Sequence, residues 1–308
     1  MADPSTRTLV YGATGAQGGA VLRALLQRGH PATGLARDEA EADALRAAGA
    51  EAALADFDDA DSLRRASDGV GRVFLSVPLG LPTATVREYG RRAIDAAREG
   101  GVGLVVFNTS TRIPEAPTAV DAFEEKREVE RALFESGVPA VSLRPTFYYG
   151  NFAGPWTAPG IVREGTVAYP VPADVEASWL SWEDAASFAV AALARPALAG
   201  QAIDIGGPEV LDGPAVAERF TRALGCEIGY VHVPADAFEK GLAEALGPEA
   251  ARSVAAMYRW MAEDGGDGLF TADADALRET FGVGRLLRLQ EWVERQDWEA
   301  LASPARTG

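Results

Sequence analysis

The amino-acid sequence predicts an α/β protein with a doubly wound parallel sheet and a smaller, mostly helical second domain. Short apolar runs alternate with amphipathic helical periods through the first half of the chain. A glycine-rich turn joins the first apolar run to the first helical period, and the pattern becomes mainly helical beyond Pro208. Strands that alternate with helices form βαβ units, which pair strands in parallel and cover both faces of the sheet with helices.

The strands of the first half are expected at the short apolar runs, which are Thr8–Tyr11, Thr33–Ala36, Ala52–Ala55, Val73–Val77, Leu104–Phe107 and Ala140–Leu143. Helical periods lie between them and stop at glycines, such as Gly29 and Gly100. Glycine just past a helical period is a common helix stop because it adopts the left-handed conformation without strain.

The pattern changes at Tyr149. A Gly- and Pro-rich stretch through Pro172 predicts loops and a short strand, a helix begins near Glu183, and Ala202–Ile205 predicts one more strand of the main sheet. We therefore expect a first domain over residues 1–150, rejoined by about 176–208, and a smaller domain over 151–175 and 209–308. The helical periods of the smaller domain are Val216–Leu224, Glu249–Met261, Ala272–Phe281 and Leu289–Trp298.

Composition excludes several classes of function. The formal net charge of -16 repels phosphate backbones and anionic membrane faces, so nucleic acid is not expected as a direct partner. One cysteine and two histidines leave little from which to build a disulfide or a metal site, and we expect neither. No apolar run reaches the roughly 18 residues of a membrane span, and the first residues lack the regions of a signal peptide. We expect a cytoplasmic protein.

The segment Gly12-Ala13-Thr14-Gly15-Ala16-Gln17-Gly18 follows the first expected strand and opens the first helix. Glycines allow a tight turn and a close approach to a pyrophosphate, and the helix N-terminus offers free N–H groups and a favourable dipole to the anion. The alternative is a merely tight strand-to-helix connection. The context favours the dinucleotide-binding turn of a Rossmann-type fold, with a glycine spacing typical of short-chain dehydrogenases.

The end of the second strand, Ala36-Arg37-Asp38, indicates which dinucleotide is bound. A carboxylate here reads the ribose hydroxyls of NAD(H), whereas an arginine can pair with the 2′-phosphate of NADP(H). Asp38 can be that acidic reader, but together with Glu41 it also has the pattern of a helix capping box. We therefore expect Arg37 to meet the 2′-phosphate, and NADP(H) to be favoured over NAD(H).

Two further strand ends lie at the edge of the sheet where ligands bind in open α/β folds. Asp56 and Phe57 follow the third strand and can flank the adenine, or they can belong to a helix cap. Ser76, Val77 and Pro78 end the fourth strand and can lie along the middle of the cofactor, or they can form a plain turn.

Lys126 is the strongest catalytic candidate. Only two of the 29 cationic residues are lysines, and the helix expected over about Asp121–Ser136 places Lys126 in the middle of its apolar arc. A lysine on a core-facing stripe is costly unless it reaches a partner or a polar ligand. The alternatives are a side chain that extends to water at the helix edge and a surface pair with Glu130. The same periodicity places Glu125 on the polar arc.

Eight segments spread in order over almost the whole chain resemble the NmrA-like branch of the atypical short-chain dehydrogenase/reductase superfamily. They are VYGATGAQG (10–18), AR (36–37), AD (55–56), FEEKREVE (123–130), GVP (137–139), LRPTFY (143–148), WEDAA (182–186) and GGPE (206–209). The resemblance implies a cofactor domain and a smaller C-terminal domain with a cleft between them. It also implies roles for single residues: the pyrophosphate region would be held by Gly12, Thr14, Gly15, Gln17 and Gly18, the 2′-phosphate by Arg37 and the nicotinamide ribose by Lys126, with Pro145 and Phe147 as a wall for the nicotinamide.

Classical members of that superfamily use Tyr-x-x-x-Lys with the tyrosine as acid/base, but the residue four before Lys126 is Ala122. The candidates for the chemistry are therefore Lys126, as proton donor or charge stabiliser, and the strand-end hydroxyls of Thr109, Ser110 and Tyr148. Thr109 and Ser110 can instead cap their turn, and Tyr148 can instead be a packing residue.

Two functions are consistent with these residues. The favoured one is an NADPH-dependent reductase of a hydrophobic carbonyl, quinone or conjugated double bond, which the apolar and aromatic residues over 147–156 support. The other is a non-catalytic protein that senses NADP(H) and docks on a protein partner. A homodimer is compatible with both, and a sugar-nucleotide epimerase is disfavoured because the Tyr-x-x-x-Lys tyrosine is missing.

Overall fold

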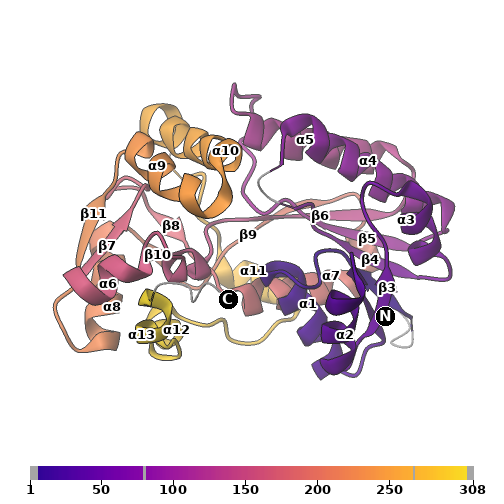
Figure 1. The fold of residues 1–308 in the computed structure, drawn as a ribbon, viewed down its shortest axis with the longest axis horizontal. Helices are drawn as coiled ribbons and strands as arrows, with labels where there is room; N and C mark the ends of the chain where they lie inside the picture. Colours follow the sequence, from indigo (N-terminus) through magenta and orange to yellow (C-terminus); the bar gives the residue numbers. More distant parts are fainter. Residues whose placement is uncertain (1–5, 79–80, 266–267, 304–308) are drawn as a thin grey trace.

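A parallel sheet is the central element of the computed structural model, which describes residues 6–78, 81–265 and 268–303 (Figure 1). In these residues the sheet has seven strands in the order β3-β2-β1-β4-β5-β6-β9, and every neighbouring pair is parallel. The strands are β1 (Thr8–Val10), β2 (Ala32–Ala36), β3 (Glu51–Leu54), β4 (Arg72–Leu75), β5 (Leu104–Asn108), β6 (Ala140–Pro145) and β9 (Ala202–Ile205). The strand order reverses between β1 and β4, which is where a crevice for ligands opens.

Helices cover both faces of this sheet, and the predicted doubly wound fold is confirmed. On one face lie α3 (Ala60–Ser67), α4 (Thr83–Glu99) and α5 (Asp121–Glu135), packed side by side (Figure 1). On the other lie α1 (Ala16–Gln27) and α7 (Trp182–Leu193), with α2 (Glu39–Ala47) joining β2 to β3. The central strands are buried on both faces, which explains why they appear in the sequence as continuous apolar runs.

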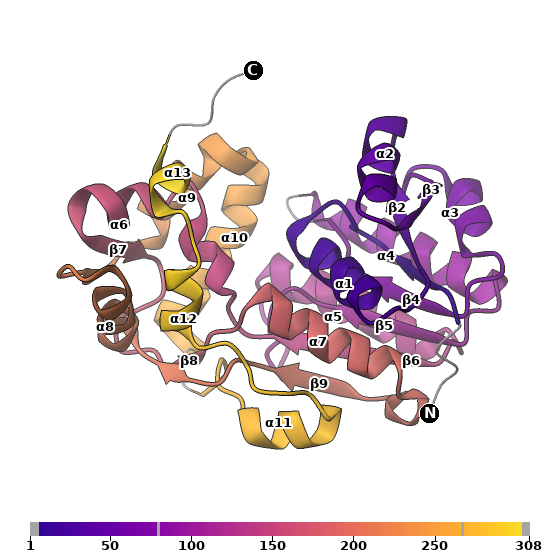
Figure 2. The same ribbon diagram turned by 90° about the horizontal axis from the view of Figure 1, so that it is seen from below.

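A second group of elements gathers on one side of the sheet (Figure 2). It has an aromatic-rich core of its own, in which Phe152, Tyr169 and Trp179 are fully buried. Two small sheets belong to it: β7 pairs with β11 in parallel and β8 with β10 antiparallel. Its elements are η1 (Tyr149–Ala153), α6 (Ala158–Glu164), β7 (Thr166–Tyr169), β8 (Ala177–Ser178), β10 (Val210–Leu211), α8 (Gly213–Leu224), β11 (Gly229–His232), α9 (Ala235–Leu246), α10 (Pro248–Trp260), η3 (Met261–Gly265), α12 (Leu289–Glu294) and α13 (Trp298–Ala302).

Two short elements connect these parts. The turn η2 (Pro196–Leu198) joins α7 to β9, and α11 (Ala274–Phe281) packs on α7, where Phe281 meets Phe188 with ring centroids 5.1 Å apart. The division of the chain into domains at the expected residues stays a prediction. The absence of a signal peptide was expected largely from residues 1–5, which lie outside the described residues. None of the described helices combines the length and the apolar character that a membrane crossing demands.

The structure differs from the sequence-based expectation at three places among its helices, and the short strands β8, β10 and β11 were not expected either. Helix α6 lies inside a stretch for which only loops and a short strand were expected, and α9 was not expected at all. The single helical period predicted over 289–298 is two helices, α12 and α13. The break occurs because Asp297 caps α13, its carboxylate accepting a hydrogen bond from the Ala300 N–H at 3.1 Å.

Asp184 ties helix α7 to the C-terminal segment. Its side chain is buried, and its carboxylate accepts a hydrogen bond from the Leu287 N–H at 2.9 Å. The Asp184 N–H donates to Ser181 Oγ at 2.9 Å, which caps the helix. Burial raises the pKa of Asp184 from 3.8 to about 6, because desolvation disfavours the charged carboxylate.

Asp184→Asn should remove a pH-dependent loss of stability. A carboxyl whose pKa is raised in the folded state is protonated more readily when folded, so wild-type stability falls as pH rises from about 4 through about 6. Relative to wild type, the variant should therefore gain up to about 3 kcal/mol between pH 4 and pH 7. Urea unfolding at both pH values measures this difference. Glu135→Gln, at an exposed residue of α5, is the control and should show no such gain. Equal pH slopes for D184N and wild type would contradict the assignment.

Candidate functional site

The turn between β1 and α1 presents backbone N–H groups at the edge of the sheet. Gly12 has a φ of 66°, and its carbonyl accepts a hydrogen bond from the Gly15 N–H at 3.0 Å. Gly15 is the N-cap residue of α1 and has no side chain to bond the first N–H groups of the helix. A Cβ atom on Gly18 would overlap the backbone of Tyr11 and Gly12, so only glycine lets the helix lie this close to the turn. This geometry fits the cradle of a pyrophosphate.

The strand ends expected to bind the cofactor line one open cleft of about 570 Å³. This volume lies in the range of small-molecule sites. The cleft runs from the glycine-rich turn along the ends of β2, β3 and β4. It brings together every cofactor candidate from those segments, namely Gly12, Thr14, Gly15, Ala16, Gln17, Gly18, Arg37, Asp56, Phe57, Ser76, Val77 and Pro78. Their contact with a cofactor stays a prediction.

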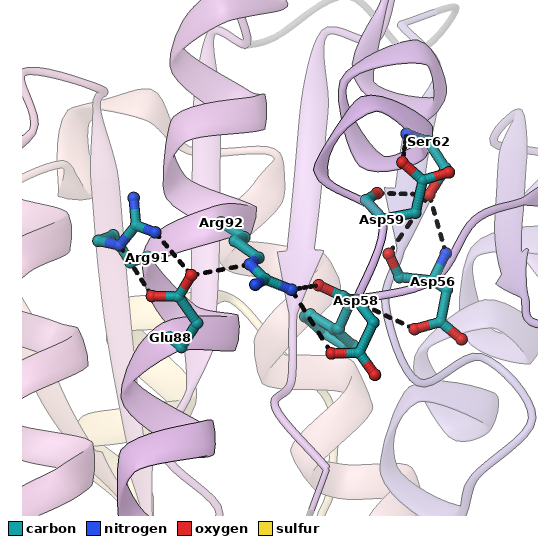
Figure 3. Close-up of polar contacts among 8 residues, drawn as sticks. Asp56, Asp58, Asp59, Ser62, Glu88, Arg91 and Arg92 are labelled. Atoms are coloured by element: carbon teal, nitrogen blue, oxygen red, sulfur yellow. Dashed lines mark hydrogen bonds and ion pairs between the residues drawn. The ribbon is translucent and has the colours of Figure 1, made fainter.

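Helix α4 fixes the loop after β3 at two points. The ring of Phe57 stacks on Tyr89, with centroids 4.7 Å apart and 8° between the planes. Arg92 Nη1 donates to the Phe57 carbonyl oxygen at 2.7 Å, and Arg92 Nε donates to Glu88 at 2.8 Å (Figure 3). Tyr89 and Phe57 both line the cleft, so the stacked pair is a rigid apolar wall suited to a planar base.

The acidic side of the same loop is organised by backbone hydrogen bonds. The Asp56 carboxylate accepts from the Asp58 N–H at 2.8 Å (Figure 3). Helix α3 is capped by Asp59, whose carboxylate accepts from the Ser62 N–H at 3.1 Å. The cap considered for Asp56 is therefore made by Asp59, and Asp56 lies at the rim of the cleft.

Arg37 lies at the rim of the cleft and is paired with an acid. Its side chain is 71% exposed, and its Nε donates to Glu41 Oε1 at 3.1 Å. Asp38 is the N-cap residue of α2 and accepts from the Glu41 N–H at 2.8 Å, as the capping interpretation predicts. In a full capping box the Glu41 side chain would also accept a hydrogen bond from the Asp38 N–H. Here it accepts from the Arg37 N–H instead, at 2.9 Å. Glu41 therefore competes with any ligand phosphate for Arg37.

Gln17 connects the cleft to the ends of β5 and β6. Its Oε1 accepts hydrogen bonds from Asn108 Nδ2 at 2.7 Å, Ser110 Oγ at 3.1 Å and Tyr148 OH at 3.5 Å. Asn108 Oδ1 also accepts from the Ser110 N–H at 2.9 Å. Ser110 has a φ of 64°, and among the described residues it is the one non-glycine in this conformation. Such strain persists only where the surroundings hold it, and it is concentrated at functional sites.

The hydroxyls expected at these strand ends differ in availability. Thr109 is fully buried, and its Oγ1 bonds the carbonyl oxygens of Thr111 at 2.6 Å and Leu143 at 3.1 Å. We therefore assign Thr109 to its turn-capping alternative. The hydroxyl of Tyr148 lies 3.3 Å from Asn108 Nδ2, and burial raises the pKa of Tyr148 above its usual range, which keeps it a neutral hydroxyl.

Lys126 is buried and paired with a second buried charge. Its side chain is 4% exposed, and Nζ lies 3.5 Å from Oε1 of Glu125, whose side chain is 8% exposed. The assignment of Glu125 to the polar arc is wrong, because Glu125 lies on the side of α5 that packs on α4, beside Thr83. Neither alternative for Lys126 holds, since Glu130 pairs with Arg144 at 2.8 Å and Lys126 does not reach water.

The surroundings shift the proton equilibria of both members of this pair. Burial lowers the pKa of Lys126, and the neighbouring Glu125 carboxylate partly opposes that shift. Burial also raises the pKa of Glu125. Its second oxygen, Oε2, is buried without a hydrogen-bond partner among the described residues. Burial therefore makes the Lys126 ammonium a stronger acid than an exposed lysine, and the Glu125 carboxyl a weaker one than an exposed glutamate.

Lys126 and Glu125 line a largely apolar cavity of about 190 Å³. The cavity lies between α5, the loops after β5 and β6, and helices α9 and α10. Phe147 forms one wall and stacks on Phe270, with centroids 4.4 Å apart. Pro145 is the last residue of β6, buried beside Ile205 of β9, so the expected wall begins beyond Pro145.

Sequence reasoning missed three kinds of site residue. Asn108 directly follows the expected strand Leu104–Phe107 and was not considered, although a polar residue after an apolar run often faces a ligand. Tyr89 lies on a helix far along the chain from Phe57, and no local pattern links the two. The lining from α9 and α10, including Phe238, Met257 and Tyr258, depends on how the second group of elements packs on α5.

Known proteins are similar to this chain in sequence and in fold. Residues 4–292 match the NmrA-like family. An NAD(P)H azoreductase of Xenophilus azovorans is 31% identical over 228 residues, covering 73% of this chain and 76% of that protein. A (4-alkanoyl-5-oxo-2,5-dihydrofuran-3-yl)methyl phosphate reductase of Streptomyces griseus is 33% identical over 80% of this chain and 83% of its own length. The solved NADPH complex of an Escherichia coli NADPH-dependent quinone oxidoreductase superposes with a TM-score of 0.75 at 22% identity, covering 94% of this chain and 98% of that one.

Arg37→Gln should weaken NADPH binding about tenfold and leave NADH binding nearly unchanged, because only NADPH carries the 2′-phosphate. Quenching of tryptophan emission during titration with each dinucleotide measures both affinities. Arg46→Gln, at an exposed and paired arginine of α2, is the matched control. Tighter binding of NADH than NADPH by wild type, lost in Glu41→Gln, would instead make Glu41 the ribose reader.

Proposed function

Because the chain belongs to the NmrA-like family, we propose that it is an NADPH-dependent reductase of a hydrophobic carbonyl, quinone or conjugated double bond. The observation that carries the proposal is the buried pair of Lys126 and Glu125 at the wall of an apolar cavity. Gln17 lines both that cavity and the dinucleotide cleft, so the two sites adjoin. Two relatives above 30% identity are named as reductases, one of an azo compound and one of an unsaturated lactone phosphate.

The residues present fit NADPH. The turn from Gly12 to Gly18 offers free N–H groups to a pyrophosphate, the stack of Phe57 on Tyr89 suits the adenine, and Arg37 suits the 2′-phosphate. When bound, NADPH supplies a hydride to the substrate.

Lys126 lines the cavity and carries a proton, so it can supply the proton that the reduction needs after hydride transfer. Addition of hydride to a quinone or to a conjugated carbonyl leaves negative charge on the carbonyl oxygen. The Lys126 ammonium can stabilise that charge and donate its proton to the oxygen. The Glu125 carboxyl, 3.5 Å from Nζ, can then return a proton to the amine. The hydroxyls of Ser110 and Tyr148 donate to Gln17 Oε1, and turning either one away from Gln17 frees its proton to orient the carbonyl.

Lys126→Met should lower kcat for reduction of the quinone menadione by about 100-fold or more, the usual contribution of a general acid. NADPH affinity should stay within a few-fold of wild type, because the main cleft does not include Lys126. Steady-state rates and the fluorescence titration give the two quantities. NADPH binding by wild type without turnover of menadione or an azo dye would favour the sensing function instead.

Glu125→Gln tests the partner of Lys126. The Glu125 carboxylate raises the pKa of Lys126, so its removal should lower that pKa. The loss of kcat at alkaline pH, where the donor becomes deprotonated, should then begin at a lower pH than in wild type. Glu128→Gln, at an exposed glutamate of the same helix, should leave the pH profile unchanged. Superimposable profiles for E125Q and wild type would show that Glu125 has only a structural role.

A further inference from the structure

A second groove, of about 780 Å³, adjoins the Lys126 cavity on the other side of Gln17 and Tyr148. It lies between the start of α1, the start of α7, the turn η1 and helix α12. We call it the tryptophan groove, because it is lined by Trp156, Trp182 and Trp292, half of the six tryptophans of the chain. The groove and the cavity share the lining residues Gln17, Tyr148, Asn151, Trp156 and Leu246.

The tryptophan rings are held in place by packing. A Cβ atom on Gly150 would overlap the ring of Trp182, and one on Gly154 would overlap the ring of Trp156, so each ring lies directly on glycine backbone. Trp292 is buried and meets Tyr149 with centroids 5.7 Å apart. Rings fixed in this way form a flat, preorganised apolar wall, which suits another planar ring system.

The charges in the groove are unusual for this chain. Arg23 of α1 and Arg295 after α12 line it, and in the described part of the chain neither has an acidic side chain within ion-pair distance. Arg23 lies back along its helix, with Nη1 3.3 Å from where a Cβ of Gly19 would be. Glu291, one turn before Arg295, pairs with Arg285 at 2.8 Å instead. Glu183 is the one acid among the described lining residues, so two cations face one carboxylate.

The two spaces also differ in size. The cavity at Lys126, about 190 Å³, is smaller than the roughly 300 Å³ or more of typical small-molecule sites. It therefore accommodates the reacting end of a substrate and little more. The adjoining groove is large enough for the rest of the substrate. It also offers flat apolar walls and two arginines that form no ion pair among the described residues.

We propose that the tryptophan groove binds the non-reacting part of the substrate, and that this part is a planar aromatic group carrying a negative charge. The substrate then reaches from Lys126 past Trp156 into the groove, with its anionic group beside Arg23 and Arg295. This assignment rests on the proposed reductase function for the reacting end. Binding in the groove itself requires no turnover.

Two dyes that differ only in charge test the proposal. The protein is titrated with 1-anilinonaphthalene-8-sulfonate and with its uncharged analogue N-phenyl-1-naphthylamine, following energy transfer from tryptophan. The double variant Arg23→Gln/Arg295→Gln should bind the sulfonate about tenfold more weakly and the neutral dye within about twofold of wild type. Trp182→Leu should weaken both dyes, because it removes part of the aromatic wall.

Arg131→Gln is the matched control, at an exposed arginine of α5 outside the groove, and should change neither affinity. Equal effects of the double variant on both dyes, no effect on either, or an equal loss in R131Q would overturn the proposal. The failure of this proposal can be distinguished from the failure of the reductase function. If the sulfonate binds through the two arginines but menadione is not reduced, the groove assignment stands and the reductase function is wrong. If menadione is reduced but binding of the sulfonate does not depend on the two arginines, the reductase function stands and the groove assignment is wrong.

Discussion

The side-chain carbonyl of Gln17 fixes three parts of the molecule to one another. It lies in the first turn of α1 and accepts hydrogen bonds from Asn108 at the end of β5 and from Tyr148 beyond β6. Parallel strands end at one edge of their sheet, so a single acceptor on the adjoining helix can reach two of them. The dinucleotide cleft, the Lys126 cavity and the tryptophan groove all include Gln17 in their walls. A displacement of this one amide changes the shape of all three.

The buried pair of Lys126 and Glu125 imposes the second constraint. Moving two charged groups out of water costs more free energy than their mutual attraction provides, unless other contacts compensate. The fold creates this cost by packing both α4 and α10 against α5. Thr83 of α4 lies beside Glu125, and Trp260 of α10 meets Phe123 with ring centroids 5.3 Å apart. A substrate carbonyl oxygen in the cavity can accept a hydrogen bond from the Lys126 ammonium, so the buried pair is best understood as a site prepared for a ligand.

The sequence was sufficient for the parts of the site that depend on local pattern. The turn over 12–18, the strand ends and the burial of Lys126 follow from period and residue type, because the main sheet is built from successive βαβ units. The position of Glu125 was not predictable in this way. Helical periodicity places it away from the main sheet, and the packing of the neighbouring helix α4 against α5 buries that side of the helix. The split of the last helical period depended on a single cap, Asp297, inside an otherwise continuous apolar pattern.

Because the chain is acidic, its arginines differ in whether a neighbouring carboxylate already pairs with them. Acidic residues number 45 against 29 cations, so an arginine at the surface normally lies near an acid. Arg37 shows the usual case, because any phosphate that binds it has to share it with Glu41. Arg23 and Arg295 form no ion pair among the described residues, although Glu183 also lines their groove. An anion that binds Arg37 has to displace the Glu41 carboxylate, whereas an anion in the tryptophan groove meets two guanidinium groups that are not engaged in such a pair. The two sites therefore bind anions in different ways. At Arg37 the anion competes with a carboxylate, and in the tryptophan groove it pairs directly with arginines beside an aromatic wall.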